Sequence, residues 1–335
     1  MTDNEAVTRI RTWAADRGSA GLRRWLQIAL GVIWVLDAAL QFQPYMFSRE
    51  FVTGVIEPAG LGSPAVVSGP VTAASHLILQ NVPVFNAAFA TVQLALGLGL
   101  LWRPTVRAAL AGTAAWALAV WWLGEGAGGI FTGSASPLTG APGAALLYVF
   151  LADLLWPARG EPAAGAAAGS VAAAGRLGPH RSRLPWLLLW GSSAYFLLQG
   201  PVSAPGALSS AIAGLADGEP SWLASVDRAT ASAVGTHGGV ISVLLAVIFA
   251  LIAAAVYVPV ATRPALVAAV IIAAVIWVLT ENLGELLTGT ATDPNTGPLL
   301  ILLAVAYWPL ASQDTASDQA HQSAGSQTRS VPSSG

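Results

Sequence analysis

The chain contains eight long apolar stretches, and these constrain its fold more than any other feature of the sequence. They cover residues 24–42, 83–102, 105–124, 141–156, 184–200, 238–260, 264–280 and 297–311. A membrane-spanning helix needs roughly 17 to 25 apolar residues, and the stretches that begin at 141 and 297 are the shortest. With 55% hydrophobic and 10% charged residues, the chain has too few polar side chains to cover a surface that faces water. We therefore predict an all-α, polytopic membrane protein with about eight transmembrane helices.

The second half of the chain repeats the first at a fixed offset of 156 residues. Five residues of one segment recur at identical spacing, and two earlier ones share the offset: Trp121, Glu125, Gly128, Thr132 and Gly133 recur as Trp277, Glu281, Gly284, Thr288 and Gly289, and Trp34 and Gln43 recur as Trp190 and Gln199. One offset that matches both an early and a late stretch indicates tandem duplication. The eight helices are therefore expected to form two tandem four-helix bundles.

This organisation divides the chain into five parts. We expect a cytoplasmic N-terminal segment at 1–23, a first four-helix membrane module at 24–157, and a cytoplasmic linker rich in Ala and Gly at 158–183. A second four-helix module follows at 184–311. The tail at 312–335 is rich in Ser and Gln, so it buries too little apolar surface to fold and is expected to be disordered.

The arginines predict how the chain crosses the membrane. All fifteen Lys and Arg residues are arginine. Thirteen of them lie in the N-terminus, the even-numbered connections or the C-terminus, and only Arg49 and Arg228 lie in odd-numbered connections. By the positive-inside rule, both termini are cytoplasmic and the odd connections face outward. The outer connections 43–82 and 201–237 contain apolar runs broken by Pro and Gly, which predicts short helices lying against the outer surface.

Composition also indicates the compartment and excludes several partners. The Ala and Gly content and the use of arginine in place of lysine are typical of a GC-rich bacterial genome, so we expect a multi-pass protein of a bacterial plasma membrane. The net charge is −2 and no basic stripe is present, which argues against nucleic acid. Membrane lipid is the expected partner. The chain has no cysteine, which excludes dithiol chemistry and thiolate metal sites.

Three acidic residues are the first candidates for function. Asp37 lies inside the first apolar stretch, and Glu125 and Glu281 end the third and seventh stretches on the outer side. Ionisable groups within a membrane tend to face a cavity or a partner. Duplication symmetry suggests that both glutamates reach a shared outer vestibule, with Asp37, Gln43, Gln199 and Asn282 nearby. In the alternative interpretation, each acid only hydrogen-bonds the adjacent helices or loop.

Two histidines complete the candidate pocket. His76 and His237 precede the second and sixth apolar stretches on the same outer side. Together with the glutamates they offer nitrogen and carboxylate ligands for zinc, and as a pair they offer axial ligands for haem. However, no two histidines are four residues apart and no H-E-x-x-H motif occurs. We therefore predict no metal and no cofactor, with zinc, haem and quinone left open.

Two segments resemble a known membrane family. Residues 24–34 and 89–107, which run from Arg24 to Trp34 and from Phe89 to Arg107, resemble the pattern of DoxX-like and MauE-like proteins, and residues 243–266 are a second match. The resemblance implies a four-helix membrane module and an accessory role beside quinone-linked or other membrane oxidoreductases. Where such modules often carry Gly and Lys late in the first helix, this chain has Ala38 and Gln41, so no role of that lysine is carried over.

Three functional classes fit these features. The first is a non-catalytic accessory or scaffold protein with an outward-facing acidic pocket. Such a protein could be a subunit of a membrane (quinone-linked) oxidoreductase complex, with other membrane proteins as partners. The second is a small-molecule or ion transporter, because carriers often have pseudo-symmetric halves. The third is a membrane enzyme acting on a lipid or quinone at the outer face, with a glutamate as general base and His237 as its partner. The sequence names no nucleophile or metal constellation for an enzyme, so we expect the first class.

Overall fold

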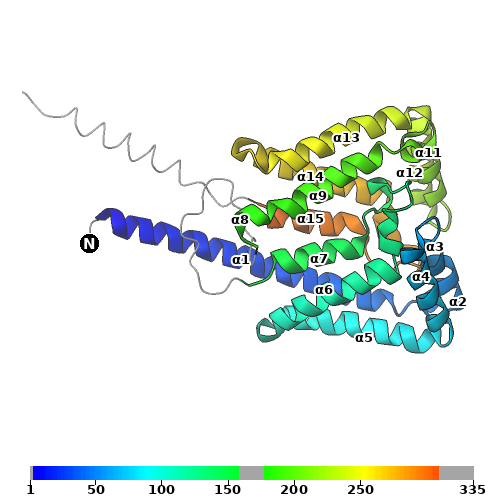
Figure 1. The fold of residues 1–335 in the computed structure, drawn as a ribbon, viewed down its shortest axis with the longest axis horizontal. Coiled ribbons are helices and arrows are strands. Elements are labelled where there is room, and N and C mark those ends of the chain that lie inside the picture. Colours follow the sequence, from blue (N-terminus) through cyan, green and yellow to red (C-terminus); the bar gives the residue numbers. More distant parts are fainter. Residues whose placement is uncertain (1–2, 158–176, 309–335) are drawn as a thin grey trace, which may run out of the picture.

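The described part of the chain is entirely helical. The computed structural model describes residues 3–157 and 177–308, and no strand occurs among them (Figure 1). The predicted tail at 312–335 and the 158–176 part of the predicted linker lie outside the described residues. The helical structure of the described residues, without strands among them, confirms the predicted all-α class.

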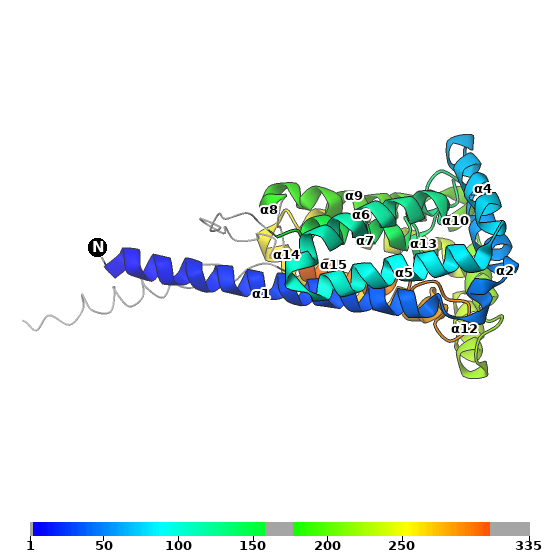
Figure 2. The same cartoon turned by 90° about the horizontal axis from the view of Figure 1, so that it is seen from below.

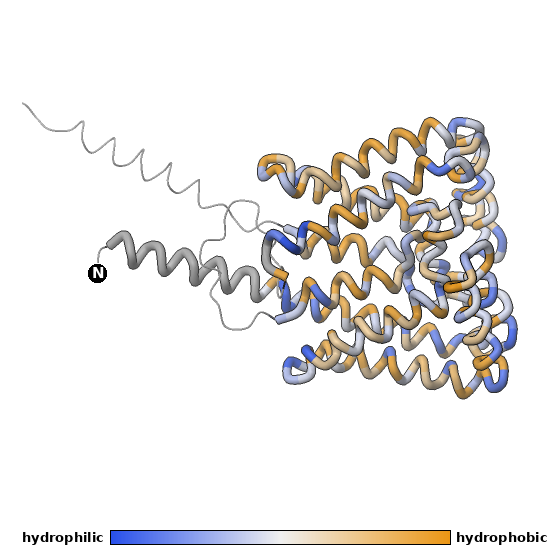
Figure 3. Tube along the Cα trace, viewed as in Figure 1, coloured by the Kyte–Doolittle hydropathy of each residue, from blue (hydrophilic) through white to orange (hydrophobic). Residues whose placement is uncertain are grey.

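All eight apolar stretches are helical, and their helices run side by side (Figures 1 and 2). They are α1 (Asp3–Leu40), α5 (Val82–Leu101), α6 (Val106–Leu123), α7 (Ala144–Leu154), α9 (Arg183–Leu197), α13 (Gly238–Ala255), α14 (Pro259–Leu279) and α15 (Thr296–Ala306). Apolar residues dominate the middle of this bundle (Figure 3). Within the described residues, four helical segments are long and apolar enough to cross a membrane: Val82–Leu101, Arg103–Leu123, Ser221–Ala255 and Pro259–Leu279. These segments identify a membrane protein.

Helix α1 begins far earlier than the apolar stretch that predicted it. The prediction starts the helix at residue 24, whereas α1 starts at Asp3. Residues 3–23 are mostly polar but rich in Ala and Arg, which favour helix. Hydrophobicity marks where a helix can lie in a bilayer, and it does not mark where the helix ends.

Helices α7 and α15 are shorter than predicted, at 11 residues each. At 1.5 Å per residue each is about 16 Å long, roughly half of the ~30 Å hydrocarbon layer. Each starts after a residue with left-handed backbone, Gly143 (φ 105°) and Asn295 (φ 64°), which prevents the helix from extending backwards. Loop residues therefore occupy the rest of the bundle length at these two places.

Short helices close one end of the bundle, which we call the loop end. The first set is η1 (Pro44–Phe47), α2 (Arg49–Phe51), η2 (Val52–Ile56), α3 (Glu57–Ala59) and α4 (Ala65–Leu79). The second set is α10 (Gly200–Ser203), α11 (Ala207–Leu215) and α12 (Ser221–Val234). Figure 2 shows α4, α2 and α12 lying across the ends of the long helices. The predicted short helices within 43–82 and 201–237 are confirmed.

The remaining elements are single turns between the longer helices. They are η3 (Arg103–Thr105), η4 (Gly126–Gly129), η5 (Pro137–Thr139), α8 (Gly178–Arg181), η6 (Gly235–His237) and η7 (Asn282–Glu285). Two of them, η4 and η7, follow the glutamates that the sequence singles out. They position the candidate site described below.

The long helices pack in pairs around a continuous core. Helix α1 contacts α5, α6 contacts α7, α9 contacts α13 and α14 contacts α15, while α7 and α15 meet at the centre. One cluster of buried apolar side chains draws on both halves of the chain. Glycine allows the closest pair: a Cβ added to Gly97 of α5 would lie 2.9 Å from the Gly31 carbonyl oxygen and 3.0 Å from the Val35 nitrogen of α1.

We predict that Gly97→Ala destabilises the α1–α5 pair. The new methyl group forces backbone apart, which typically costs about 1–3 kcal/mol, against a helix-propensity gain of at most about 1 kcal/mol. Gly191→Ala in α9 is the matched control, because a Cβ there meets nothing within 4 Å. The measurement is thermal denaturation of the detergent-solubilised protein. Equal melting temperatures for the two variants would contradict the close packing.

Candidate functional site

A cavity of about 310 Å³ lies inside the first half of the chain. Its wall comes from α1, α5, α6 and α7, from the short helices of the loop end, and from one loop of the second half. Most of the lining is apolar, and six aromatic side chains contribute to it: Trp34, Phe51, Phe85, Phe89, Trp116 and Tyr148. The volume is in the range of sites for small organic molecules.

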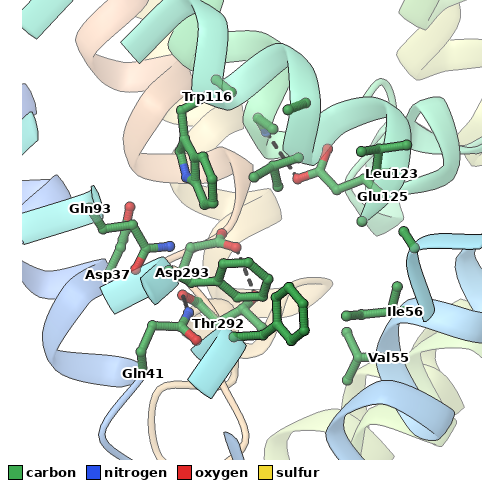
Figure 4. A pocket seen from close by; sticks show the side chains of 18 of the residues that line it. Asp37, Gln41, Val55, Ile56, Gln93, Trp116, Leu123, Glu125, Thr292 and Asp293 are labelled. Carbon is green, nitrogen blue, oxygen red and sulfur yellow. Dashed lines mark hydrogen bonds between the residues drawn. The ribbon is translucent and has the colours of Figure 1, made fainter. Parts of the chain in front are cut away.

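Polar side chains converge on this apolar space. Asp37 lies in the last turn of α1, Gln41 follows directly after the end of that helix, and Gln93 joins them from α5. All three are buried, with Asp37 only 1% exposed. The Tyr148 hydroxyl of α7 donates a hydrogen bond of 2.5 Å to Asp37 Oδ2. In Figure 4, Asp37, Asp293 and Glu125 approach the same space from three different elements.

Several of these polar groups have no hydrogen-bond partner among the described residues. The unpartnered buried atoms that belong to lining residues are Trp34 Nε1, Asp37 Oδ1, Gln41 Oε1, Gln93 Oε1, Trp116 Nε1 and Glu125 Oε2. A buried polar group without a partner costs about 1–3 kcal/mol, and native proteins keep few of them. Six such atoms around one cavity offer hydrogen-bonding positions to whatever occupies the space.

Asp293 reaches the cavity from the second half of the chain. The end of α1 holds its loop: Gln43 Nε2 donates to the Ala291 carbonyl at 2.8 Å, and Gln41 Nε2 donates to the Thr292 carbonyl at 3.5 Å. Asp293 Oδ1 in turn accepts from the Asn295 backbone N–H at 2.7 Å. The sequence analysis missed Asp293, because the residue 156 positions earlier is Pro137 and the repeat gives no acid there. It also missed Gln93, which is detectable as an amide in the middle of an apolar helix.

Glu125 lines the same cavity just beyond the end of α6. Its Oε1 accepts a hydrogen bond of 3.0 Å from the Ala145 backbone N–H at the start of α7, and its Oε2 has no partner among the described residues. Loss of solvent, with a smaller contribution from the charge of Asp293, raises the pKa of Glu125 to about 8. The carboxyl group is therefore protonated over much of the neutral range.

A left-handed turn positions each repeated glutamate. Residues 126–129 and 282–285 all have positive φ, between 50° and 72°. Each turn is fixed by the preceding tryptophan: Trp121 Nε1 donates to the Pro142 carbonyl at 2.7 Å, and Trp277 Nε1 donates to the Pro294 carbonyl at 2.9 Å. Close approach requires the glycine, since a Cβ on Gly128 would lie 1.8 Å from the Pro142 oxygen. The two halves thus share local structure as well as sequence here.

Glu281 has a different environment from Glu125 at the equivalent place. Its Oε1 accepts from the Thr296 hydroxyl and its Oε2 from the Gly297 backbone N–H at 3.0 Å, so both oxygens are satisfied within the protein. Loss of solvent raises its pKa to about 7. Glu281 does not line either of the two cavities that Glu125 lines. Of the predicted acids, the structure brings Asp37 and Glu125 to one cavity, and Asp293 is the third acid there.

The other predicted site residues lie outside this cavity. Asn282 Nδ2 donates to Asp227 Oδ2 at 3.2 Å and to the Leu215 carbonyl, and Gln43 holds the 291–293 loop. Gln199 precedes α10 and does not line the cavity. His76 and His237 are exposed. No group of three or more His, Asp and Glu side chains suited to a metal occurs in the described ranges.

The corresponding space in the second half is filled. At the offset of 156, Ser193 stands for Asp37, Leu197 for Gln41 and Phe249 for Gln93. The Phe249 ring packs edge-on against Trp190, with ring centres 5.0 Å apart. A space of only about 10 Å³ remains beside these residues. The two halves therefore differ at this place: the first contains a cavity with polar groups in its wall, and the second is filled by apolar side chains.

A second cavity of about 500 Å³ adjoins the first at the loop end. It is lined by loop residues of both halves, many of them Gly, Ser and Thr. The two cavities share Val55, Glu125, Thr292 and Asp293. The polar cavity and the aromatic cavity therefore lie next to each other, with two carboxyl groups in the wall of both.

We predict that Glu125 makes stability fall as pH rises. Between its ordinary pKa of 4.5 and the folded value of about 8, the folded state binds more protons than the unfolded state, so folding free energy is lost across that window. Glu125→Gln removes this loss. Its melting temperature relative to the unmodified protein should rise steadily from pH 5 to pH 8.

The control for this titration is Glu281→Gln. Its effect should have the same sign but level off about one pH unit lower than that of Glu125→Gln, because the pKa of Glu281 is raised only to about 7. The measurement is the melting temperature of each solubilised variant against pH. A difference between Glu125→Gln and the unmodified protein that stays constant with pH would contradict the raised pKa.

Any function of this site depends on three features: the cavity, its unpartnered polar atoms and its three carboxyl groups. They combine an apolar interior with a small number of fixed polar groups, which is typical of a binding site for an organic molecule. Comparison of the chain with protein-family models, with curated proteins and with solved structures finds no match.

Proposed function

We propose that the protein is an integral membrane accessory protein that holds a small amphipathic molecule in the cavity of its first half. The observation that carries this proposal is the set of six unpartnered buried polar atoms around one apolar space. An apolar body of the ligand fits the aromatic wall, and a polar end supplies the missing hydrogen bonds. The polar lining consists of carboxyl, amide and indole groups with the hydroxyls of Tyr148 and Thr292, and no histidine lies among the described lining residues. We therefore favour binding over catalysis.

The arrangement in the membrane is part of the same proposal. We infer two tandem four-helix modules, α1, α5, α6 and α7, then α9, α13, α14 and α15, crossing the bilayer eight times with α7 and α15 tucked between loops. The shared left-handed turns and the matching Trp121 and Trp277 contacts support a duplication. The arginine distribution supports a loop end outside and both termini in the cytoplasm of a bacterial cell. The DoxX-like resemblance supports an accessory place beside a membrane oxidoreductase.

A transporter is the second candidate, and one observation favours it. The aromatic cavity and the polar cavity of the loop end lie next to each other and share Glu125 and Asp293 in their walls, an arrangement that would suit a route through a carrier. An accessory protein keeps its ligand in place, whereas a carrier releases it at the opposite face. Both functions require the ligand to bind in the cavity, but only the carrier moves the ligand across the membrane.

We predict that Gln93→Phe fills the cavity with its ring and so prevents the ligand from binding. The change places in the first half the side chain that fills the second half at Phe249. The unmodified protein, purified from its native membrane, should carry a bound small molecule and a partner protein detectable by mass spectrometry. Gln93→Phe should lose the small molecule and keep the partner.

Leu98→Phe is the matched control, because it adds the same ring to α5 at a position that is 54% exposed and outside the cavity. It should retain both. A purified protein with neither ligand nor partner would contradict the accessory role. Flux of the co-purified molecule in proteoliposomes, lost in Glu125→Gln, would favour the carrier instead.

The proposed membrane orientation can be tested with single introduced cysteines. These are specific probes because the natural chain has no cysteine. His76→Cys and His237→Cys are exposed positions at the loop end, so a membrane-impermeant maleimide should label them in intact cells. Arg103→Cys, exposed in η3 at the opposite end, should react only after the membrane is permeabilised. The reverse pattern would invert the proposed topology.

A further inference from the structure

We propose that the molecule held in the aromatic cavity is a protonated organic amine with an apolar body. This inference rests on the proposed function, that the cavity binds an amphipathic ligand, and it adds the chemical class of the polar end. Three independent properties of the site lead to it: its charge, its hydrogen-bonding balance and its aromatic wall.

The charge of the site is one-sided. Asp37, Glu125 and Asp293 all line the cavity, and the described lining residues include no arginine and no histidine. A carboxylate in a low-dielectric space is costly unless a cation pairs with it. No protein cation fills that role at this place, so a ligand that brings a positive charge gains more here than a neutral or anionic one.

The unpartnered atoms show the same preference. Asp37 Oδ1, Gln41 Oε1 and Gln93 Oε1 are acceptors, and Trp34 Nε1 and Trp116 Nε1 are donors. Glu125 Oε2 is a fourth acceptor once a neighbouring cation favours the ionised form of its carboxyl group. An ammonium group donates three hydrogen bonds and accepts none. It therefore matches a site in which acceptors are in excess, whereas a carbonyl or carboxylate ligand would leave most of these oxygens unsatisfied.

The wall around the acids is aromatic. The rings of Trp34 and Tyr148 pack with centres 4.3 Å apart, and Tyr148 contacts Asp37. The rings of Phe89 in α5 and Trp116 in α6 pack with centres 5.6 Å apart. A cation near aromatic faces gains about 0.5–2 kcal/mol, the larger values applying where water is excluded. The same rings accommodate an apolar ligand body, so one wall serves both ends of an amphipathic amine.

The second half of the chain sets the expected stoichiometry. Ser193 replaces the buried acid, and Phe249 occupies the space of Gln93. That half lacks both the charge and the volume for the same ligand. We therefore expect one amine per chain, bound in the first half.

The test uses three probes with one apolar body and different polar ends. The full-length protein in lipid nanodiscs is titrated with 4-phenylbutylamine, 4-phenylbutanol and 4-phenylbutyrate, and binding to empty nanodiscs is subtracted. We expect saturable binding of one amine per chain, at least about tenfold tighter than the alcohol, which corresponds to about 1.4 kcal/mol. The carboxylate should show no saturable binding, and Gln93→Phe should abolish binding of the amine.

Asp293→Asn separates charge from shape. It keeps the side-chain oxygen that accepts from the Asn295 backbone, so the loop should fold while the site loses one negative charge. Binding of the amine should weaken about tenfold, and binding of the alcohol should not change. Glu50→Gln, which neutralises an exposed acid outside the cavity, should alter neither.

Each outcome separates this inference from the proposed function. If the alcohol binds as tightly as the amine, or if Asp293→Asn weakens both equally, the cationic class is wrong while the binding function stands. If no probe binds and the native protein carries a neutral or anionic molecule, the inference is again overturned and the function again stands. If no probe binds and the native protein is empty, both fail.

Discussion

The site depends on a contact between the two halves of the chain, in which the end of α1 holds the loop that carries Asp293. Gln43 and Gln41 donate to the Ala291 and Thr292 carbonyls across a sequence separation of about 250 residues. This contact fixes the acidic loop of the second half against the first, while Trp277 holds the loop to its own half through the Pro294 carbonyl. The cavity therefore has lining residues from both halves of the chain.

The two halves keep the same turn and differ in what lies beneath it. Trp121 and Trp277 fix their loops by equivalent hydrogen bonds, and each glutamate accepts from the backbone at the start of the following short helix. In the first half the space below is open and polar groups face it, whereas in the second half Phe249 and Trp190 close it. Under the proposed duplication, one open and one closed copy of the same scaffold would give a single ligand position without symmetry.

The sequence predicted the helices well because their apolar stretches reflect burial and lipid contact, which are properties of residue composition. It failed at the start of α1, where polar helix formers extend the helix, and at α7 and α15, where left-handed residues shorten it. Asp37 and Glu125 were predictable as acids in apolar surroundings. Asp293 was not, since its place in the cavity depends on a contact between distant segments, and nothing in the local sequence distinguishes it from an ordinary loop acid.

The short length of α7 and α15 has a consequence for the depth at which charge can reside. A full-length helix there would expose only its apolar side chains to the interior of the layer, and any carboxyl group would have to remain at the membrane surface. In the proposed membrane arrangement, folded loops take the place of the missing halves of these two helices, and their backbone amides and hydroxyl groups extend a polar environment inward. The protein would thereby hold polar groups at a depth that lipid alone keeps free of ions.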